Sequence, residues 1–169
     1  GTAPASVVSA FTSVFTKPPM PLPRYQQLDA PLMGNGDMAV ATSGEPENQQ
    51  FWLSKNDLWE LRNVWCRSGP RPFGHLDVLI PQLQGATYHA EQNLLNATTT
   101  SLFKKNKTEI TMRSWVSATE NLLVVELSAQ GAPAEGDVQL WTPATARTIH
   151  QVDHRPKPGT APDWVGMPS

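Results

Sequence analysis

The sequence has a single cysteine, Cys66, among its 169 residues, so no disulfide can form within the chain. Charged residues are also scarce: they make up 17% of the chain, and the formal net charge is -2. Nucleic-acid-binding domains usually carry a basic face, so we expect no nucleic-acid partner. No apolar run approaches the roughly 20 residues that a membrane-spanning helix needs, so we expect no membrane span.

The motifs of the common catalytic and cofactor sites are missing too. No serine lies on a Gly-x-Ser-x-Gly elbow, and the Gly-Asn-Gly stretch at 34–36 precedes a predicted strand, whereas a phosphate-binding loop precedes a helix. Histidine and carboxylate side chains alternate at His75 and Asp77, at His89 and Glu91, and within 150–154, without the ligand spacing of a specific zinc site. We therefore expect no metal and no cofactor.

A carboxylate pair for glycoside hydrolysis is not marked in the sequence either. An inverting pair needs carboxyl groups about 6.5–9.5 Å apart, and Asp57 and Glu60 are one of many pairs that could meet this condition. Nothing in the sequence indicates that either is buried. We therefore assign no catalytic residue to this chain.

Cysteine content and sequons point to different compartments. A lone cysteine is typical of a reducing compartment, or it pairs with another chain. Two acceptor sequons, at Asn96 and Asn106, are typical of a secreted glycoprotein. The N-terminal stretch shows no intact signal peptide and is compatible with a mature N-terminus. We expect a secreted, lysosomal or extracellular protein glycosylated at Asn96 and Asn106, with the cytoplasm as the alternative.

What the sequence does contain is a long region in which apolar and polar residues alternate with period two. β-Branched and aromatic residues dominate it, and short connections rich in turn residues join its segments. Such spacing predicts antiparallel meanders and therefore an all-β sandwich or barrel. The predicted strands are residues 49–55, 75–82, 87–95, 97–103, 108–117, 121–129 and 137–141.

The two ends differ from this central region in their proline content. Residues 1–33 are predicted to be an irregular lead-in with a short helix at 6–15 before a proline cluster. Residues 143–169 are Pro-rich and poor in apolar residues, which is typical of a linker or wrapping tail. The sandwich domain is accordingly assigned to residues 34–142.

Two short polar stretches carry the candidate site residues. Gly34 and Gly36 flank Asn35 and predict a sharp corner, and the upstream prolines indicate that it starts the first strand rather than closing a hairpin. The second stretch, 54–65, offers amide and carboxylate groups for a polyhydroxylated ligand and tryptophans that could stack on one. Residue types alone favour Asn and Asp as turn or helix caps there. The candidate residues are Asn35, Asp37, Asn56, Asp57, Trp59 and Trp65.

Alternation also places three of the six tryptophans, Trp52, Trp115 and Trp141, on the more polar faces of their strands. They could form a sugar-stacking platform, a docking surface for another domain, or a face covered by the chain's own tails or a neighbouring sheet. We favour the docking surface over the sugar platform. In the last predicted strand, Val138 and Leu140 are expected to face the core.

The order of four motifs carries a family resemblance: APLMGNGDMAV, QFWLSKNDLWE, GHLDVLIPQ and LLVVELSA. It resembles the N-terminal β-sandwich domain of glycoside hydrolase family 95, the α-L-fucosidase-type enzymes, and more weakly that of family 65. The likeness covers about residues 30–142, although ELRNVWCRSGPRP replaces the family's Ser-Gly-rich loop. The residues at the family's corner and Asn-(Glu or Asp)-x-x-Trp positions are Gly34, Asn35, Gly36, Asn56, Asp57 and Trp59.

The resemblance implies an antiparallel sandwich of the super-sandwich type that packs against a catalytic (α/α)6 barrel. The family's inverting acid and base lie in that barrel, outside these 169 residues, so the resemblance gives this chain no catalytic residue. It places the six candidate residues at the barrel interface or pocket rim. The expected partner is the barrel, as a further domain or a second chain, or a glycan. The alternative is a free-standing carbohydrate-binding or structural sandwich in an extracellular assembly.

Overall fold

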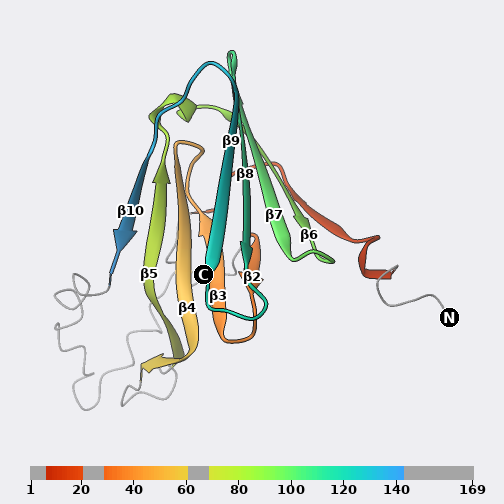
Figure 1. The fold of residues 1–169 in the computed structure, drawn as a ribbon, viewed down its shortest axis with the longest axis vertical. Helices are drawn as coiled ribbons and strands as arrows, with labels where there is room; N and C mark the ends of the chain where they lie inside the picture. Colours follow the sequence, from red (N-terminus) through yellow and green to blue (C-terminus); the bar gives the residue numbers. More distant parts are fainter. Residues whose placement is uncertain (1–6, 21–28, 61–68, 143–169) are drawn as a thin grey trace, which may run out of the picture.

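A computed structural model describes residues 7–20, 29–60 and 69–142 (Figure 1). Over these residues the chain forms two five-stranded antiparallel sheets packed face to face, which confirms the predicted all-β sandwich. The first sheet has the order β1-β6-β7-β8-β9, and the second has the order β10-β5-β4-β3-β2. No helix in this described part is long and apolar enough to span a membrane.

The strand bounds follow the predicted pattern closely from residue 87 onward. The first sheet contains β1 (Thr12–Phe15), β6 (Thr87–Asn93), β7 (Thr98–Lys105), β8 (Thr108–Val116) and β9 (Leu123–Gly131). The second sheet contains β2 (Leu32–Gly34), β3 (Met38–Ser43), β4 (Asn48–Glu60), β5 (Gly69–Leu79) and β10 (Asp137–Trp141). The predicted strand 75–82 is wrong at both ends: β5 begins at Gly69 and ends at Leu79, and Pro81, which has no N–H to donate to a sheet, begins a 3-10 turn, Pro81–Leu83.

The core lies between the inner faces of the two sheets. Phe51 and Val40 of the second sheet and Phe103 of the first are almost wholly buried, and Phe103 packs edge-on against Tyr88 with ring centroids 5.7 Å apart. In β8 the predicted inner residues Ile110, Met112 and Val116 are buried as expected, whereas the alternate ones are not. Burial of these apolar side chains is the main favourable term that holds the sheets together.

The predicted helix at 6–15 is wrong over its second half, because Thr12–Phe15 forms β1 and pairs with β6. Valine, threonine and phenylalanine favour extended backbone, and Phe15 packs against the core. The lead-in that we expected to be irregular therefore contributes one strand to each sheet, since Leu32–Gly34 forms β2. The predicted Pro-rich tail, 143–169, lies outside the described residues.

The Gly-Asn-Gly corner does lead into a strand, β3, but the prediction that it does not close a hairpin was wrong. Leu32 pairs with Ala41 and Gly34 with Ala39, so the corner closes a hairpin between β2 and β3. Gly36 has a φ of +92°, which glycine adopts without strain. Pro31 precedes β2 without disrupting pairing because β2 is the last strand of its sheet.

The predicted burial of Val138 and Leu140 is contradicted by the structure. They are 64% and 67% exposed, although they lie on the inner face opposite Val78 and Leu76 of β5. The reason is that the first sheet ends at β9, while the second extends as far as β10 (Figure 1). The inner face of β10 therefore lacks a strand above it among the described residues.

Candidate functional site

The Gly-Asn-Gly corner lies against the loop between β8 and β9, so it connects the two sheets at one end. The Asn35 Nδ2 donates to the carbonyl oxygens of Ser117 and Glu120, each at 3.0 Å. Its Oδ1 accepts hydrogen bonds from the backbone N–H groups of Asp37 at 3.0 Å and Met38 at 2.8 Å. One side chain thus fixes the hairpin turn and the contact between sheets.

Asp37 and Asp57 share one cation. The Nζ of Lys55 lies 3.1 Å from Asp37 Oδ1 and 2.8 Å from Asp57 Oδ2. Asn121 from the facing loop also donates to Asp37 Oδ2. Hydrogen bonds from Asn121 and then Lys55 lower the pKa of Asp37 below its usual 3.8, and Asp57 and Asp37 raise the pKa of Lys55 above its usual 10.5.

Asn56 connects the corner to β4. Its backbone N–H donates to the carbonyl oxygen of Asp37 at 2.8 Å, and its Nδ2 donates to that of Gly36 at 3.1 Å. This part of β4 carries a register shift between Ser54 and Trp59, so Asn56 lies in an irregular stretch of the strand. Its side chain therefore bonds to the hairpin rather than capping a helix.

The structure thus brings together four of the six predicted site residues: Asn35, Asp37, Asn56 and Asp57. We call these four with Lys55 and Asn121 the corner cluster. Of the other two, Trp59 lies in β4 opposite Pro70 by its backbone, and Trp65 lies outside the described residues. Because the cluster's polar groups bond mainly to one another and to backbone, its clearest role is to hold the sheets together.

The aromatic row, a feature that sequence reasoning did not assemble, crosses the outer face of the second sheet. It consists of Trp52 on β4, His75 on β5 and Trp141 on β10, which are opposite one another in register. The Trp52 and His75 ring centroids are 4.3 Å apart, and those of His75 and Trp141 are 5.3 Å apart at an interplanar angle of 18°. The second pair is stacked, and the first is in close contact with its rings tilted by 31°.

A polar network runs beside the aromatic row. Gln50 Nε2 donates to Asp77 Oδ1 at 3.0 Å, and Asp77 Oδ2 lies 3.4 Å from His75 Nε2. Ser43 Oγ accepts from Trp52 Nε1 at 3.2 Å and donates to Gln50 Oε1 at 3.3 Å. Ser43, His75 and Asp77 are at most 8% exposed although they lie on an outward face. Burying such groups is costly unless each has a partner, and each has one here.

The outer face of the first sheet is different in kind. It carries exposed ion pairs between Lys104 and Glu109 at 2.9 Å and between Arg113 and Glu126 at 3.1 Å. Trp115 lies there, as alternation predicted, with the Arg113 guanidinium 5.6 Å from its ring centroid. A face of exposed charges is typical of a surface that stays in solvent. The outer face of the second sheet, which carries the aromatic row, does not have this character.

The sequence signal for the aromatic row was present but incomplete. The alternating His75 and Asp77 attracted attention as metal ligands, yet no group of three or more His, Cys, Asp or Glu side chains in the described part of the chain could hold a metal ion. Their partners, Gln50 and Trp52, are more than twenty residues away in sequence and meet them only through strand pairing. The row forms because of the register in which β4, β5 and β10 pair, and this register cannot be read from the sequence.

Both sequons lie in exposed turns of the first sheet. Asn96 is in the turn between β6 and β7, where its backbone N–H donates to Asn93 Oδ1 at 3.1 Å. Asn106 is in the turn between β7 and β8 with a φ of 54°. Both asparagine residues are exposed.

Comparison with protein-family models and with curated proteins gives no match to this chain, so the resemblance to family 95 rests on its sequence motifs.

Proposed function

We propose that this chain is the non-catalytic β-sandwich of an α-L-fucosidase-like glycoside hydrolase and packs against a catalytic (α/α)6 barrel. The observation that supports this most directly is the aromatic row: Trp52 and Trp141 pack on the two sides of the buried His75, which is paired with the buried Asp77 on an outward face. Tryptophan is enriched among the residues that contribute most to protein interfaces. The row is therefore the docking surface that we assign to the barrel.

The opposite side of the sandwich supports the same orientation. The outer face of the first sheet carries the exposed ion pairs, and both sequons lie in its turns. Glycans are bulky and hydrated, so they favour a face that stays in solvent. Secretion and glycosylation are part of this proposal. The proposal also includes the assignment of the corner cluster, Trp59 and Trp65 to the rim of the interface.

The decisive experiment is isolation of the chain from its native source under non-denaturing conditions. We expect a complex that releases this sandwich and a barrel-sized polypeptide, or one longer chain that contains both, on denaturation. Trp141→Ala should weaken the association at least about tenfold, whereas the matched Trp115→Ala on the other sheet should leave it unchanged. Equal effects of the two variants would refute docking through the aromatic row.

A second function is favoured by the exposure of one ring. Trp141 stacks on His75 with one face and is 45% exposed, which leaves a flat apolar surface of the kind on which a pyranose ring stacks. If the sandwich acts as a carbohydrate-binding module, fucosides or related glycans should quench its tryptophan fluorescence. Trp141→Ala should abolish that change, and Trp115→Ala should not.

A further inference from the structure

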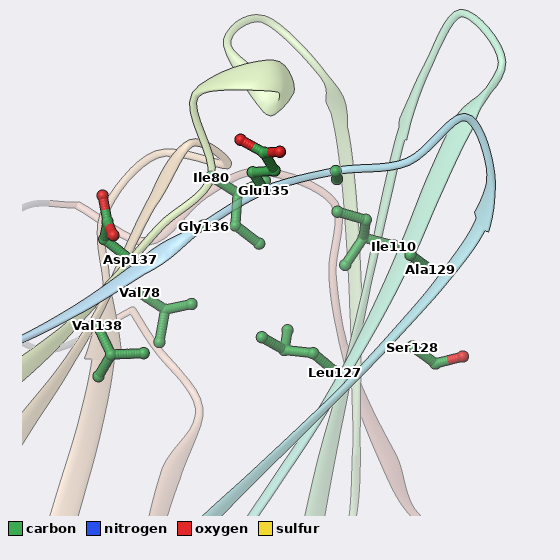
Figure 2. A pocket seen from close by; sticks show the side chains of 11 residues that line it. Val78, Ile80, Ile110, Leu127, Ser128, Ala129, Glu135, Gly136, Asp137 and Val138 are labelled. Atoms are coloured by element: carbon green, nitrogen blue, oxygen red, sulfur yellow. The ribbon is translucent and has the colours of Figure 1, made fainter.

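The two ends of β8 differ in how the facing sheets are joined. Near Ile110, at the start of the strand, a cavity of about 160 Å³ lies between the sheets, and Figure 2 shows Leu127 projecting into it opposite Val78. Beyond the end of the strand, the Gly-Asn-Gly corner of the second sheet bonds to the loop at 117–121 of the first. The corner thus joins the sheets by hydrogen bonds at one end of β8, while packing between them is incomplete at the other.

The residue that makes this link, Asn35, is followed by glycine, and this is the only Asn-Gly pair in the sequence. In such a pair no side chain shields the backbone nitrogen of the glycine, which can therefore attack the side-chain amide of the asparagine. Gly36 is exposed, and a Cβ placed on it would meet nothing within 4 Å. The attacking group is therefore accessible.

The reaction open to this pair is deamidation. The Gly36 nitrogen gives its proton to solvent and forms a bond to Asn35 Cγ, the Cγ–Nδ2 bond breaks, and Nδ2 takes up a proton and leaves as ammonia. Water then opens the resulting cyclic imide at either of its carbonyl groups, which gives aspartate or isoaspartate. Ring closure joins neighbouring residues of one chain, so it needs no enzyme, and water is the only co-reactant.

The closed corner protects Asn35 from this reaction. The Nδ2 of Asn35 donates to two carbonyl oxygens of the loop at 117–121, and its Oδ1 accepts from two backbone N–H groups of its own turn. Ring closure makes Cγ tetrahedral and releases Nδ2, so it has to break these bonds. The reaction therefore requires the corner to part from the loop.

The product cannot restore the link. A carboxylate has no N–H to donate, and its oxygen would lie beside the carbonyl oxygens of Ser117 and Glu120, each of which is 3.0 Å from the amide nitrogen. The Oδ1 of Asn121, 3.3 Å from the same nitrogen, is a third acceptor there. Isoaspartate also lengthens the backbone of the turn, in which the Asn35 N–H donates to the Met38 carbonyl oxygen at 3.1 Å.

We propose that Asn35 is a site of spontaneous deamidation, which reacts when the corner parts from the loop at 117–121 and whose acidic product keeps the two apart. The change is one-way, because the ammonia is lost to solvent. Its effect is local, since Gln92 Nε2 of β6 donates to the Leu32 carbonyl oxygen of β2 at 2.6 Å and ties the two sheets independently of the corner cluster. The inference does not depend on the barrel proposal.

The test incubates the full chain and a synthetic peptide of residues 31–40 in the same mildly alkaline buffer and follows both by peptide mass spectrometry. We expect exchange of the amide nitrogen for oxygen at Asn35 in both, at least about tenfold more slowly in the folded chain because the corner must open first. Isoaspartate, identified by its fragment ions, should accompany aspartate, since direct hydrolysis of the amide gives aspartate alone. Asn48, which precedes glutamine, is the internal reference and should stay unchanged.

Two variants separate opening of the corner from general loss of stability. Asn121→Ala removes an acceptor for Asn35 and a donor to Asp37, so deamidation at Asn35 should be about threefold faster or more. Asn106→Ala strains a residue with a φ of 54° in the turn at the other end of β8 and leaves the corner intact, so the rate should not change.

The deamidated chain carries one more negative charge, so ion exchange separates it from the unmodified chain. It should unfold at a lower denaturant concentration, as Asn35→Asp does. Circular dichroism checks that both variants are folded before incubation.

Several results would overturn the proposal. They are equal rates in the folded chain and the peptide, aspartate without isoaspartate, equal effects of Asn121→Ala and Asn106→Ala, and an unchanged unfolding midpoint of the deamidated chain. Absence of conversion at Asn35 in both the wild type and Asn121→Ala, under conditions that convert the peptide, would overturn it as well.

Discussion

At the residue scale, the side chain of Asn35 connects two parts of the chain that are distant in sequence. Its amide bonds to the loop at 117–121, which follows it by more than eighty residues, and its carbonyl oxygen fixes the turn at Asp37 and Met38. Four short hydrogen bonds from one side chain leave several backbone groups without partners if it is removed.

We expect Asn35→Ala to lower the free energy of unfolding by about 2 kcal/mol, because each hydrogen bond contributes roughly 0.5–1.5 kcal/mol net and the sites are partly solvated. Asn35→Asp keeps the acceptor but places a carboxylate oxygen beside the carbonyl oxygens of Ser117 and Glu120, so at neutral pH it should cost at least as much. Urea titrations of the three proteins give the comparison. A loss under about 0.5 kcal/mol for Asn35→Ala would show that water replaces the side chain.

The lowered pKa of Asp37 predicts in which direction the stability of the fold changes with pH. Its pKa is below 3.8 in the folded chain because the charged form accepts hydrogen bonds from Asn121 and Lys55. A lowered pKa means that this contribution to stability is present above pH 3.8 and is lost as the pH falls through the folded value. The difference in unfolding midpoint between the wild type and Asp37→Asn should therefore shrink on acidification. A constant difference down to pH 2 would contradict this.

The sequence indicated where these residues lie better than it indicated what they do. Asn35, Asp37, Asn56 and Asp57 were assigned to the same interface without a prediction of contact between them, and the structure brings them together. Their partners in the loop at 117–121 were not predictable, because nothing local to either segment indicates the other. Their expected role at an interface is still a proposal.

At the element scale, the position of β10 depends on a glycine in the neighbouring strand. A Cβ added to Gly74 of β5 would collide with the backbone carbonyl of Trp141. Only a residue without a side chain lets β10 approach β5 here, and so lets Trp141 stack on His75.

Gly74→Ala should therefore displace β10, with a loss of roughly 1–3 kcal/mol in unfolding free energy and greater solvent quenching of tryptophan fluorescence. The matched change is Gly36→Ala, where a Cβ meets nothing within 4 Å and only the positive φ is penalised. It should cost about 1 kcal/mol without altering quenching. If the two variants quench alike, β10 is not held by this contact.

The strands of the β6–β8 meander were more predictable than the two short strands near the N-terminus, β1 and β2. β6, β7 and β8 alternate clearly because one face is buried and the other solvated. β1 and β2 are short edge strands beside prolines, so their local signal resembled irregular chain, and only pairing with β6 and β3 makes them strands. For β10, the prediction of which residues face inward was correct. The prediction that they are buried was wrong, since burial depends on what lies opposite.

At the scale of the whole molecule, the two outer faces differ so clearly that they predict where modification occurs. The sequons at Asn96 and Asn106 lie at opposite ends of β7, in exposed turns of the charged sheet. Peptide mass spectrometry of native material should find hexose-containing additions on at least one of these asparagines, removed by an N-glycosidase. Unmodified peptides at both sites would favour a cytoplasmic protein and weaken the proposed orientation.

The sandwich architecture as a whole was predictable from short turns between alternating segments, since such connections allow only antiparallel neighbours. The sequence did not predict which strands end each sheet. β9 ends the first sheet and β10 ends the second, and this strand order depends on tertiary packing that no short stretch of sequence records.

Strand order also sets the order in which the molecule can assemble. β6, β7, β8 and β9 are consecutive along the chain and pair through tight turns, so this meander closes only short loops. By contrast, Thr12 must find Asn93, and Asp137 must find Leu79, across long stretches of chain. Non-local pairings form slowly, so β1 and β10 should join last in refolding. Until β10 joins, the edge of β5 with which it pairs is unprotected, which makes the late arrival of β10 the step most open to competing association.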